Sequence, residues 1–211
     1  MWRMEDVLEV YQRPFDPKRP LVCLDEKPVQ LLADARESLP AKPGSVAKRD
    51  YEYKREGTAN LFVAFEPLAN WRDLRVTRQR TRQDFAAFVT NLVENRYRNA
   101  DKIVLVMDNL NTHSPGSLYE LLPADQAKRI ADRLEIHYTP KHGSWLNMAE
   151  IEFSVVGKRL PDRVATAESL AKHCRAIERE RNNSQATVDW QFRAADARIK
   201  LKRLYPSIEL R

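Results

Sequence analysis

Apolar residues near the start of the chain recur at the spacing of a helix. The face of this helix would carry Met4, Val7, Leu8 and Tyr11. Three prolines between residues 14 and 20 then end the pattern. A short amphipathic helix at such a position packs against a larger element. We expect residues 1–16 to be the end of a linker helix that begins before Met1.

Short apolar or alternating runs predict strands in the next part of the chain. These runs are Leu21–Leu24, Arg49–Arg55, Leu61–Phe65 and Leu74–Thr77. The first strand would end at Asp25, and a loop rich in Ala, Pro and Ser (residues 38–47) would follow it. Gly57 would mark a turn, and Pro67 and Asn70 would break the chain before the last run. We expect the last three of these strands, joined by short turns, to form an antiparallel meander.

The clearest helix signal of the chain follows this meander. Its apolar face would consist of Phe85, Phe88, Val89, Leu92 and Val93. Thr81 and Asp84 stand just before that face with the spacing of a capping box. A continuous apolar run, Ile103–Met107, then predicts a strand that is buried on both faces and ends at Asp108.

Helical patterns and one more strand fill the rest of the chain. We expect helices at about 116–133, from Ser144 onward, at 166–181 and at 188–204, with a strand at Glu135–Tyr138. This order predicts an α/β fold over residues 17–205. Its mixed sheet would combine the antiparallel meander with parallel strands, and helices would flank it.

The chain is basic, with 36 Lys and Arg against 30 Asp and Glu. Residues 151–211 hold 13 of the basic and 8 of the acidic residues, so most of the net charge of +6 lies in the C-terminal third. Such a surplus favours an anionic partner, because Lys and Arg displace the counterions of nucleic-acid phosphates. The alternative is a solvated basic surface without a partner.

Cysteine usage and the absence of apolar segments indicate a cytoplasmic protein. Cys23 and Cys174 are far apart and belong to no pairing motif, as is usual in a reducing compartment. The first ten residues include acidic ones where a signal peptide needs an apolar core. No segment approaches the about 18 apolar residues of a membrane span.

Three acidic residues occupy positions suited to chemistry. Asp25 and Asp108 follow apolar runs, and Glu150 lies in the first turns of the helix that starts near Ser144. Strand ends line the crevice in which open α/β sheets bind ligands. Carboxylates gathered there would repel one another unless a hard divalent cation lay between them. A plain turn or cap is the alternative for each aspartate.

The local sequences around these three acids resemble those of one protein family. DNLNTH from Asp108, TPKHGSWLNMAEIEF from Thr139 and VCLDEKPVQ from Val22 look like the three catalytic blocks of the mariner superfamily of DDE transposases. The nearest likeness is to its bacterial insertion-sequence branch, and it covers residues 15 to 205. The third block is the most specific, because a Leu-Asn pair precedes Glu150 by three residues.

This resemblance implies a ribonuclease-H-like catalytic domain in which Asp25, Asp108 and Glu150 form the catalytic and metal-binding triad. Two Mg²⁺ ions roughly 4 Å apart, with Mn²⁺ as a substitute, would serve an in-line phosphoryl displacement. The expected reaction is excision at terminal inverted repeats of double-stranded DNA and insertion at a TA dinucleotide by a homodimer associated with the nucleoid. Glu26 and Glu152 are rivals for the triad, but we expect them to be surface or supporting charges.

Several neighbours of the triad are candidates for DNA contacts. They are Lys27, Asn109, Asn111, His113, Lys141, His142 and Trp145. The residues before the catalytic helix would meet an anion at its N-terminus. Trp145 suits base stacking, although a Trp at a helix start is more often a core anchor.

Members of this family carry helix-turn-helix modules before the catalytic domain, and we expect that region to be missing here. Three functions therefore remain open. The first is a metal-dependent transposase catalytic domain. The second is an inactive or repurposed DNA-binding remnant of a truncated transposase. The third is a host nuclease of the same fold, which the LNMAE block disfavours.

Overall fold

Five strands form one mixed sheet in the computed structural model, which describes residues 1–36, 41–46, 50–184 and 187–205. The strands are β1 (Leu21–Asp34), β2 (Tyr53–Glu66), β3 (Trp71–Thr77), β4 (Ile103–Met107) and β5 (Leu134–Tyr138). Their order across the sheet is β3-β2-β1-β4-β5. β1, β2 and β3 pair antiparallel, and β1, β4 and β5 pair parallel. The predicted combination of a meander with parallel strands is confirmed.

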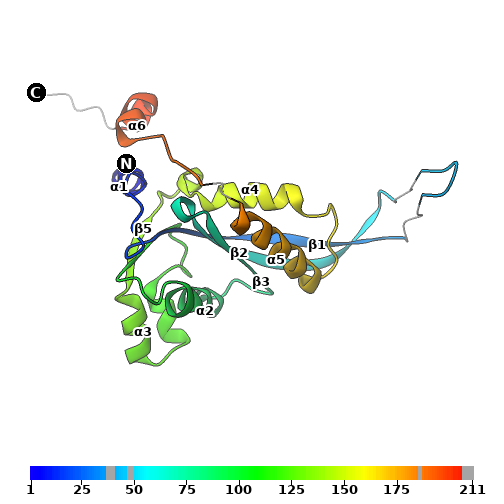
Figure 1. The fold of residues 1–211 in the computed structure, drawn as a ribbon, viewed down its shortest axis with the longest axis horizontal. Coiled ribbons are helices and arrows are strands. Elements are labelled where there is room, and N and C mark those ends of the chain that lie inside the picture. Colours follow the sequence, from blue (N-terminus) through cyan, green and yellow to red (C-terminus); the bar gives the residue numbers. More distant parts are fainter. Residues whose placement is uncertain (37–40, 47–49, 185–186, 206–211) are drawn as a thin grey trace, which may run out of the picture.

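β1 and β2 are longer than predicted and form a hairpin that projects from the body of the molecule (Figure 1). β1 does not end at Asp25 but continues to Asp34, because β2 supplies a partner for its backbone all the way. The predicted turn at Gly57 is also wrong. Gly57 lies inside β2 with a φ of 106°, opposite a register shift at Leu31/Leu32, so it belongs to a β-bulge. The predicted strand at 49–55 and loop at 38–47 lie partly outside the described residues.

The helices are α1 (Trp2–Val10), α2 (Arg82–Asn91), α3 (Ala124–Ala131), α4 (Ala149–Arg159), α5 (Ala167–Asn183) and α6 (Ala194–Lys200). α2 begins with the predicted capping box between Thr81 and Asp84. The helix predicted at 188–204 is shorter in the structure. Residues 187–193 form no helix, α6 begins at Ala194, and a 3₁₀ turn, Lys202–Leu204, follows it. Among the described helices, none has the length and apolar character to cross a membrane.

Helices cover both faces of the sheet. α4 and α5 lie on one face, and α2 and α3 on the other (Figure 1). Alternate residues of β1 reach the two cores, because side chains of a strand point to opposite faces. Cys23 joins the core under α4 and α5, whereas Leu24 joins the core under α2 and α3. β4 is buried on both faces, as predicted.

α1 docks against β5 and α6 through both apolar and polar contacts. Val7 and Leu8 are buried in the core. The Asp6 carboxylate lies 2.8 Å from Nδ1 of His137 on β5. The Tyr11 hydroxyl donates a 2.5 Å hydrogen bond to the carbonyl of Leu146, just before α4. α1 is thus fixed next to the turn that leads into α4.

A buried ion pair between Glu152 and Arg72, joined by the partly exposed Arg181, holds α4 to the sheet. Glu152 has no exposed surface, although the sequence suggested a surface or supporting charge. Its carboxylate lies 3.3 Å from Nε of the equally buried Arg72 on β3 and accepts a 2.8 Å hydrogen bond from Arg181 on α5. The surface interpretation is therefore wrong, because two arginines from distant parts of the chain enclose this carboxylate.

We predict that Glu152→Ala lowers the free energy of unfolding by about 3–5 kcal/mol, because it leaves the buried Arg72 without its counter-ion. Glu150→Ala, an equal truncation on the same helix at an exposed position, is expected to change it by less than about 1 kcal/mol. Chemical denaturation of both variants measures the difference. Equal stability of the two would contradict the structural role of Glu152.

Candidate active site

The parallel register of β1 and β4 brings two aspartates side by side. Leu21 pairs with Val104, and Asp25 precedes Asp108 by the same 83 residues. Adjacent parallel strands that keep one offset place such residues next to each other. β4 ends at Met107, so Asp108 is the first residue beyond it. Asp25 still lies within β1, opposite Val63 of β2.

The Asp25 carboxylate is buried and partly satisfied by local donors. The backbone N–H of Glu26 donates a 2.9 Å hydrogen bond to one of its oxygens. The Asn147 side-chain amide donates to the other at 3.3 Å and to the carbonyl of Leu24 at 2.9 Å. The Asn147 side-chain oxygen accepts from the N–H of Ala149. Asn147 therefore connects β1 to the first turn of α4.

Glu150 is the second residue of α4 and is exposed. Its negative charge is the smallest of the contributions that shift the pKa of Asp25. Asp25 therefore lies within electrostatic range of both Asp108 and Glu150. Within the described ranges, no three Asp, Glu, His or Cys side chains lie close enough together to hold a metal ion as they stand.

Burial and the negative charges of Asp108, Glu26 and Glu150 together raise the pKa of Asp25 to about 7, against the hydrogen bond from Glu26 N–H, which lowers it. Such repulsion is what a bound cation relieves, and carboxylate oxygens are the ligands that hard divalent ions prefer. The donor chemistry of Asp25, Asp108 and Glu150 thus fits a divalent metal.

His113 lies beneath the site between two carboxylates. Its Nδ1 is 2.5 Å from Oδ1 of Asp108, and its Nε2 is 2.6 Å from Oε2 of Glu26. Burial disfavours the charged imidazolium, but the two carboxylates outweigh burial and raise the pKa of His113 to about 9. The His113 side chain is only 1% exposed, so the structure places this predicted DNA contact below the surface. Glu26 is likewise buried, which corrects its interpretation as a surface charge.

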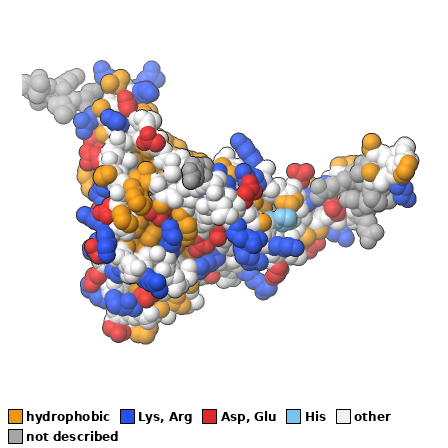
Figure 2. All heavy atoms as spheres, viewed as in Figure 1, with side chains coloured by type: hydrophobic (Ala, Val, Ile, Leu, Met, Phe, Trp, Pro, Cys, Tyr) orange, Lys and Arg blue, Asp and Glu red, His pale blue; other side chains and the backbone are white. Residues whose placement is uncertain are grey.

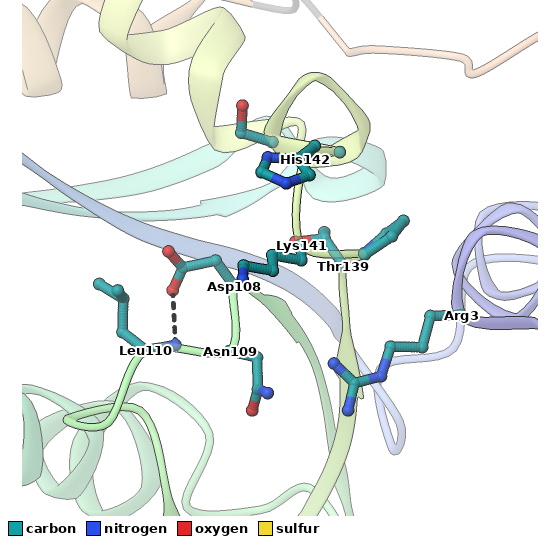
Figure 3. Close-up of a pocket in the computed structure, with 10 residues that line it drawn as sticks. Arg3, Asp108, Asn109, Leu110, Thr139, Lys141 and His142 are labelled. Carbon is teal, nitrogen blue, oxygen red and sulfur yellow. Dashed lines mark hydrogen bonds between the residues drawn. The ribbon is translucent and has the colours of Figure 1, made fainter. Parts of the chain in front are cut away.

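A cleft of about 570 Å³ opens beside Asp108. Its walls include Arg3, Asp108, Asn109, Thr139, Lys141 and His142. In Figure 3, Arg3 approaches from α1, and Lys141 and His142 come from the loop after β5. Two cationic side chains thus border the same hollow as a carboxylate of the candidate triad.

The other predicted DNA contacts, Asn111, Lys27 and Trp145, are not among the residues that line this cleft. Asn111 lines a neighbouring hollow together with Glu26 and Arg80. The Lys27 ammonium lies 5.9 Å from the ring centre of Phe153 on α4. The Trp145 ring is half-exposed and stands edge-on to Phe192, 6.1 Å between ring centres.

The sequence prediction missed two residues of the site. Arg3 was absent from it, because nothing in the sequence shows that α1 docks beside Asp108. Asn147 was noted only as part of the LNMAE block, and its hydrogen bond to Asp25 joins two residues that are 122 positions apart in the sequence.

On the face shown in Figure 2, Lys and Arg side chains are interspersed with acidic ones over several elements.

Comparison with known proteins supports the same interpretation. Residues 20–171 match the sequence family described as DDE superfamily endonuclease, which uses a divalent metal. A search of curated proteins gives no significant match.

Solved structures of the Mos1 transposase resemble the fold. The Mos1 strand transfer complex is 16% identical, with a TM-score of 0.58, and covers 88% of this chain and 55% of its own. The Mos1 paired-end complex with the left transposon end is 17% identical, with a TM-score of 0.57, and covers 87% and 55%. The Mos1 mariner paired-end complex with Mn is 15% identical, with a TM-score of 0.51, and covers 85% and 59%.

These likenesses show the ribonuclease-H-like fold that the sequence predicted. The chain spans a little over half the length of the Mos1 chains that it matches.

We predict that Asp25 makes the metal-free protein less stable as pH rises. Its folded pKa of about 7 exceeds the ordinary value of 3.8, so between these pH values the folded state holds a proton that the unfolded state releases. The stability from this proton is present at low pH and is lost as pH rises through about 7. The stability of Asp25→Asn relative to the unsubstituted protein should therefore increase over this window by a few kcal/mol, at about 1.4 kcal/mol per pKa unit.

Urea denaturation in the presence of a chelator, at a series of pH values from about 4 to about 8, tests this expectation. A difference between the two proteins that does not change with pH would show that Asp25 has an ordinary pKa.

Proposed function

The chain belongs to the DDE superfamily endonucleases, and on that premise we propose that it is the catalytic domain of a cut-and-paste DNA transposase. The observation that carries the proposal is the parallel register of β1 and β4, which places Asp25 and Asp108 next to each other. Glu150, in the first turn of α4, is the third acid of the proposed triad. The fold shared with the Mos1 transposase complexes supports it.

In this proposal Asp25, Asp108 and Glu150 hold two Mg²⁺ ions, for which Mn²⁺ can substitute. Bound there, the ions would stabilise the attacking and leaving oxygens of an in-line displacement at phosphorus. Asn147 keeps the Asp25 carboxylate in place by its hydrogen bond. In this proposal water attacks the phosphodiester first, and the freed 3′-hydroxyl of the DNA attacks second.

The cleft beside Asp108 is the proposed path of the DNA backbone. Arg3 and Lys141 border it with cationic side chains that suit phosphate oxygens. His142 and Asn109 line the same cleft, and Asn111 lines the neighbouring hollow, which Asn109 shares. Lys27, next to Phe153 of α4, is a further proposed phosphate contact. Trp145 presents a half-exposed ring on which a base can stack.

We further propose double-stranded terminal inverted repeats and TA target sites as the DNA partners, and a homodimer as the active assembly. The Mos1 structures, which are a strand transfer complex and paired-end complexes, support this extension. Recognition of a particular repeat sequence is assigned to no residue of this chain.

We predict that Asp108→Asn lowers Mg²⁺- or Mn²⁺-dependent nicking of supercoiled plasmid DNA by roughly a thousandfold, because metal ions contribute several kcal/mol of transition-state stabilisation. Asp101→Asn is the matched control. It makes the same substitution at an exposed residue just before the start of β4. This control should nick at the unsubstituted rate.

Undiminished nicking by Asp108→Asn would overturn the triad. If the unsubstituted protein bound DNA but nicked none with either metal, the inactive remnant would be the correct function. Cleavage of an RNA–DNA hybrid with no activity on duplex DNA would instead favour the host nuclease.

We predict that Arg3→Ala and Lys141→Ala each weaken binding to duplex DNA of any sequence and each lower the slope of log affinity against log salt by about 1. Lys128→Ala is the control, because Lys128 is exposed on α3 and pairs with Asp132. Fluorescence anisotropy at several salt concentrations measures both quantities. Slopes that equal that of the control would remove these residues from the DNA path.

A further inference from the structure

Three ionisable side chains form a continuous chain behind the site, and the proposed function leaves two of them without a role. They are Glu26, His113 and Asp108, joined at 2.6 Å and 2.5 Å through the two imidazole nitrogens. Glu26 lies on the face of β1 opposite to Asp25, because neighbouring residues of a strand point to opposite faces. Asp25 therefore lies on one face of the sheet. Glu26 lies on the other face and is connected to Asp108 through His113.

The surroundings of Glu26 show how unusual its position is. Both carboxylate oxygens are buried, and neither accepts a hydrogen bond of good geometry from a described residue. Its second cationic neighbour, Arg80, is more remote, at 3.8 Å, and half-exposed. A buried carboxylate is costly unless a charge compensates it, so His113 is the group on which Glu26 depends.

The ring of His113 is held in one orientation. It packs against Phe85 with 4.9 Å between the ring centres, and the Tyr138 hydroxyl donates a 2.9 Å hydrogen bond to the His113 carbonyl. Nδ1 also lies 3.3 Å from the carbonyl oxygen of Asp108. The imidazole can therefore serve the two carboxylates at its ends but not turn away from them.

We propose that Glu26 and His113 are positioning residues that orient the Asp108 carboxylate for metal binding, an inference that rests on the proposed function. His113 donates to Oδ1 of Asp108 and fixes that side chain, which leaves its other oxygen directed to the cleft. Glu26 contacts the other imidazole nitrogen and so holds the ring in place from its far side. The arrangement corresponds to the supporting carboxylates behind metal-binding histidines, with the imidazole here behind a carboxylate.

The test is Mn²⁺ binding to the whole chain without DNA, measured by isothermal titration calorimetry. We expect Glu26→Gln and His113→Asn each to weaken Mn²⁺ binding by about 10-fold to 100-fold, the range for loss of a supporting partner. The double variant should be no weaker than the weaker single variant, because both residues act through one chain of contacts.

Glu66→Gln is the matched control. Glu66 is a buried carboxylate at the end of β2, bonded at 2.9 Å by Tyr97 and paired with Arg96. The same amide substitution there is expected to cost stability and to leave Mn²⁺ affinity unchanged. Thermal unfolding of every variant separates loss of fold from loss of affinity. If Glu26→Gln does not fold, Glu26→Asp takes its place as the test variant. Aspartate keeps the carboxylate but moves it away from His113 by the length of one methylene group.

The outcomes distinguish this inference from the proposed function. Unchanged affinity in folded Glu26→Gln, with binding lost in Asp108→Asn, would overturn the positioning role and keep the metal site. Additive losses in the double variant, or an equal loss in Glu66→Gln, would overturn it as well. Absence of Mn²⁺ binding in the unsubstituted protein would overturn the metal site and the positioning role together.

Discussion

β1 and β4 pair in parallel over three residue pairs, and the placement of the catalytic candidates depends on this short ladder. It aligns Asp25 with Asp108 because both follow the paired segment at the same distance. β4 stops there, whereas β1 continues with β2 alone. The two aspartates thus lie next to each other where β4 ends, Asp25 within β1 and Asp108 just beyond β4. A slip of one residue would turn Asp25 to the other face and separate the pair.

Neighbouring carboxylates repel one another, and the surrounding structure must offset this electrostatic free energy. The raised pKa of Asp25 is one expression of it, and the hydrogen bond from Asn147 is another. Buried ion pairs lie on both faces behind the site. Arg72 and Arg181 compensate Glu152 under α4, and His113 compensates Glu26 under α2. The acidic edge is therefore built on buried charges that fix the elements carrying it, which is a use of ionic groups for position more than for stability.

The sequence predicted those elements whose side chains carry a clear period. β4 is an unbroken apolar run, and α2 has both an apolar face and a capping box, so both were correct. The outer part of the β1–β2 hairpin was not predicted at its true length, because its residues are mostly exposed and show no clear period of apolar positions. The burial of Glu152 escaped prediction for a different reason. Its partner Arg72 is 80 residues away, and the sequence contains no local sign of the contact.

The position of α1 shows how the cleft depends on an element outside the sheet. Tyr11 bonds the carbonyl of Leu146 and lies 3.4 Å from the N–H of Met148, on either side of Asn147. The same helix presents Arg3 to the cleft (Figure 3). α1 and Tyr11, which follows it directly, therefore contact the turn that carries Asn147, and α1 also places the Arg3 side chain in the same cleft as Asp108. Displacement of α1 would release Asn147 and withdraw Arg3 together, so the order of the site and its capacity for phosphate are physically linked.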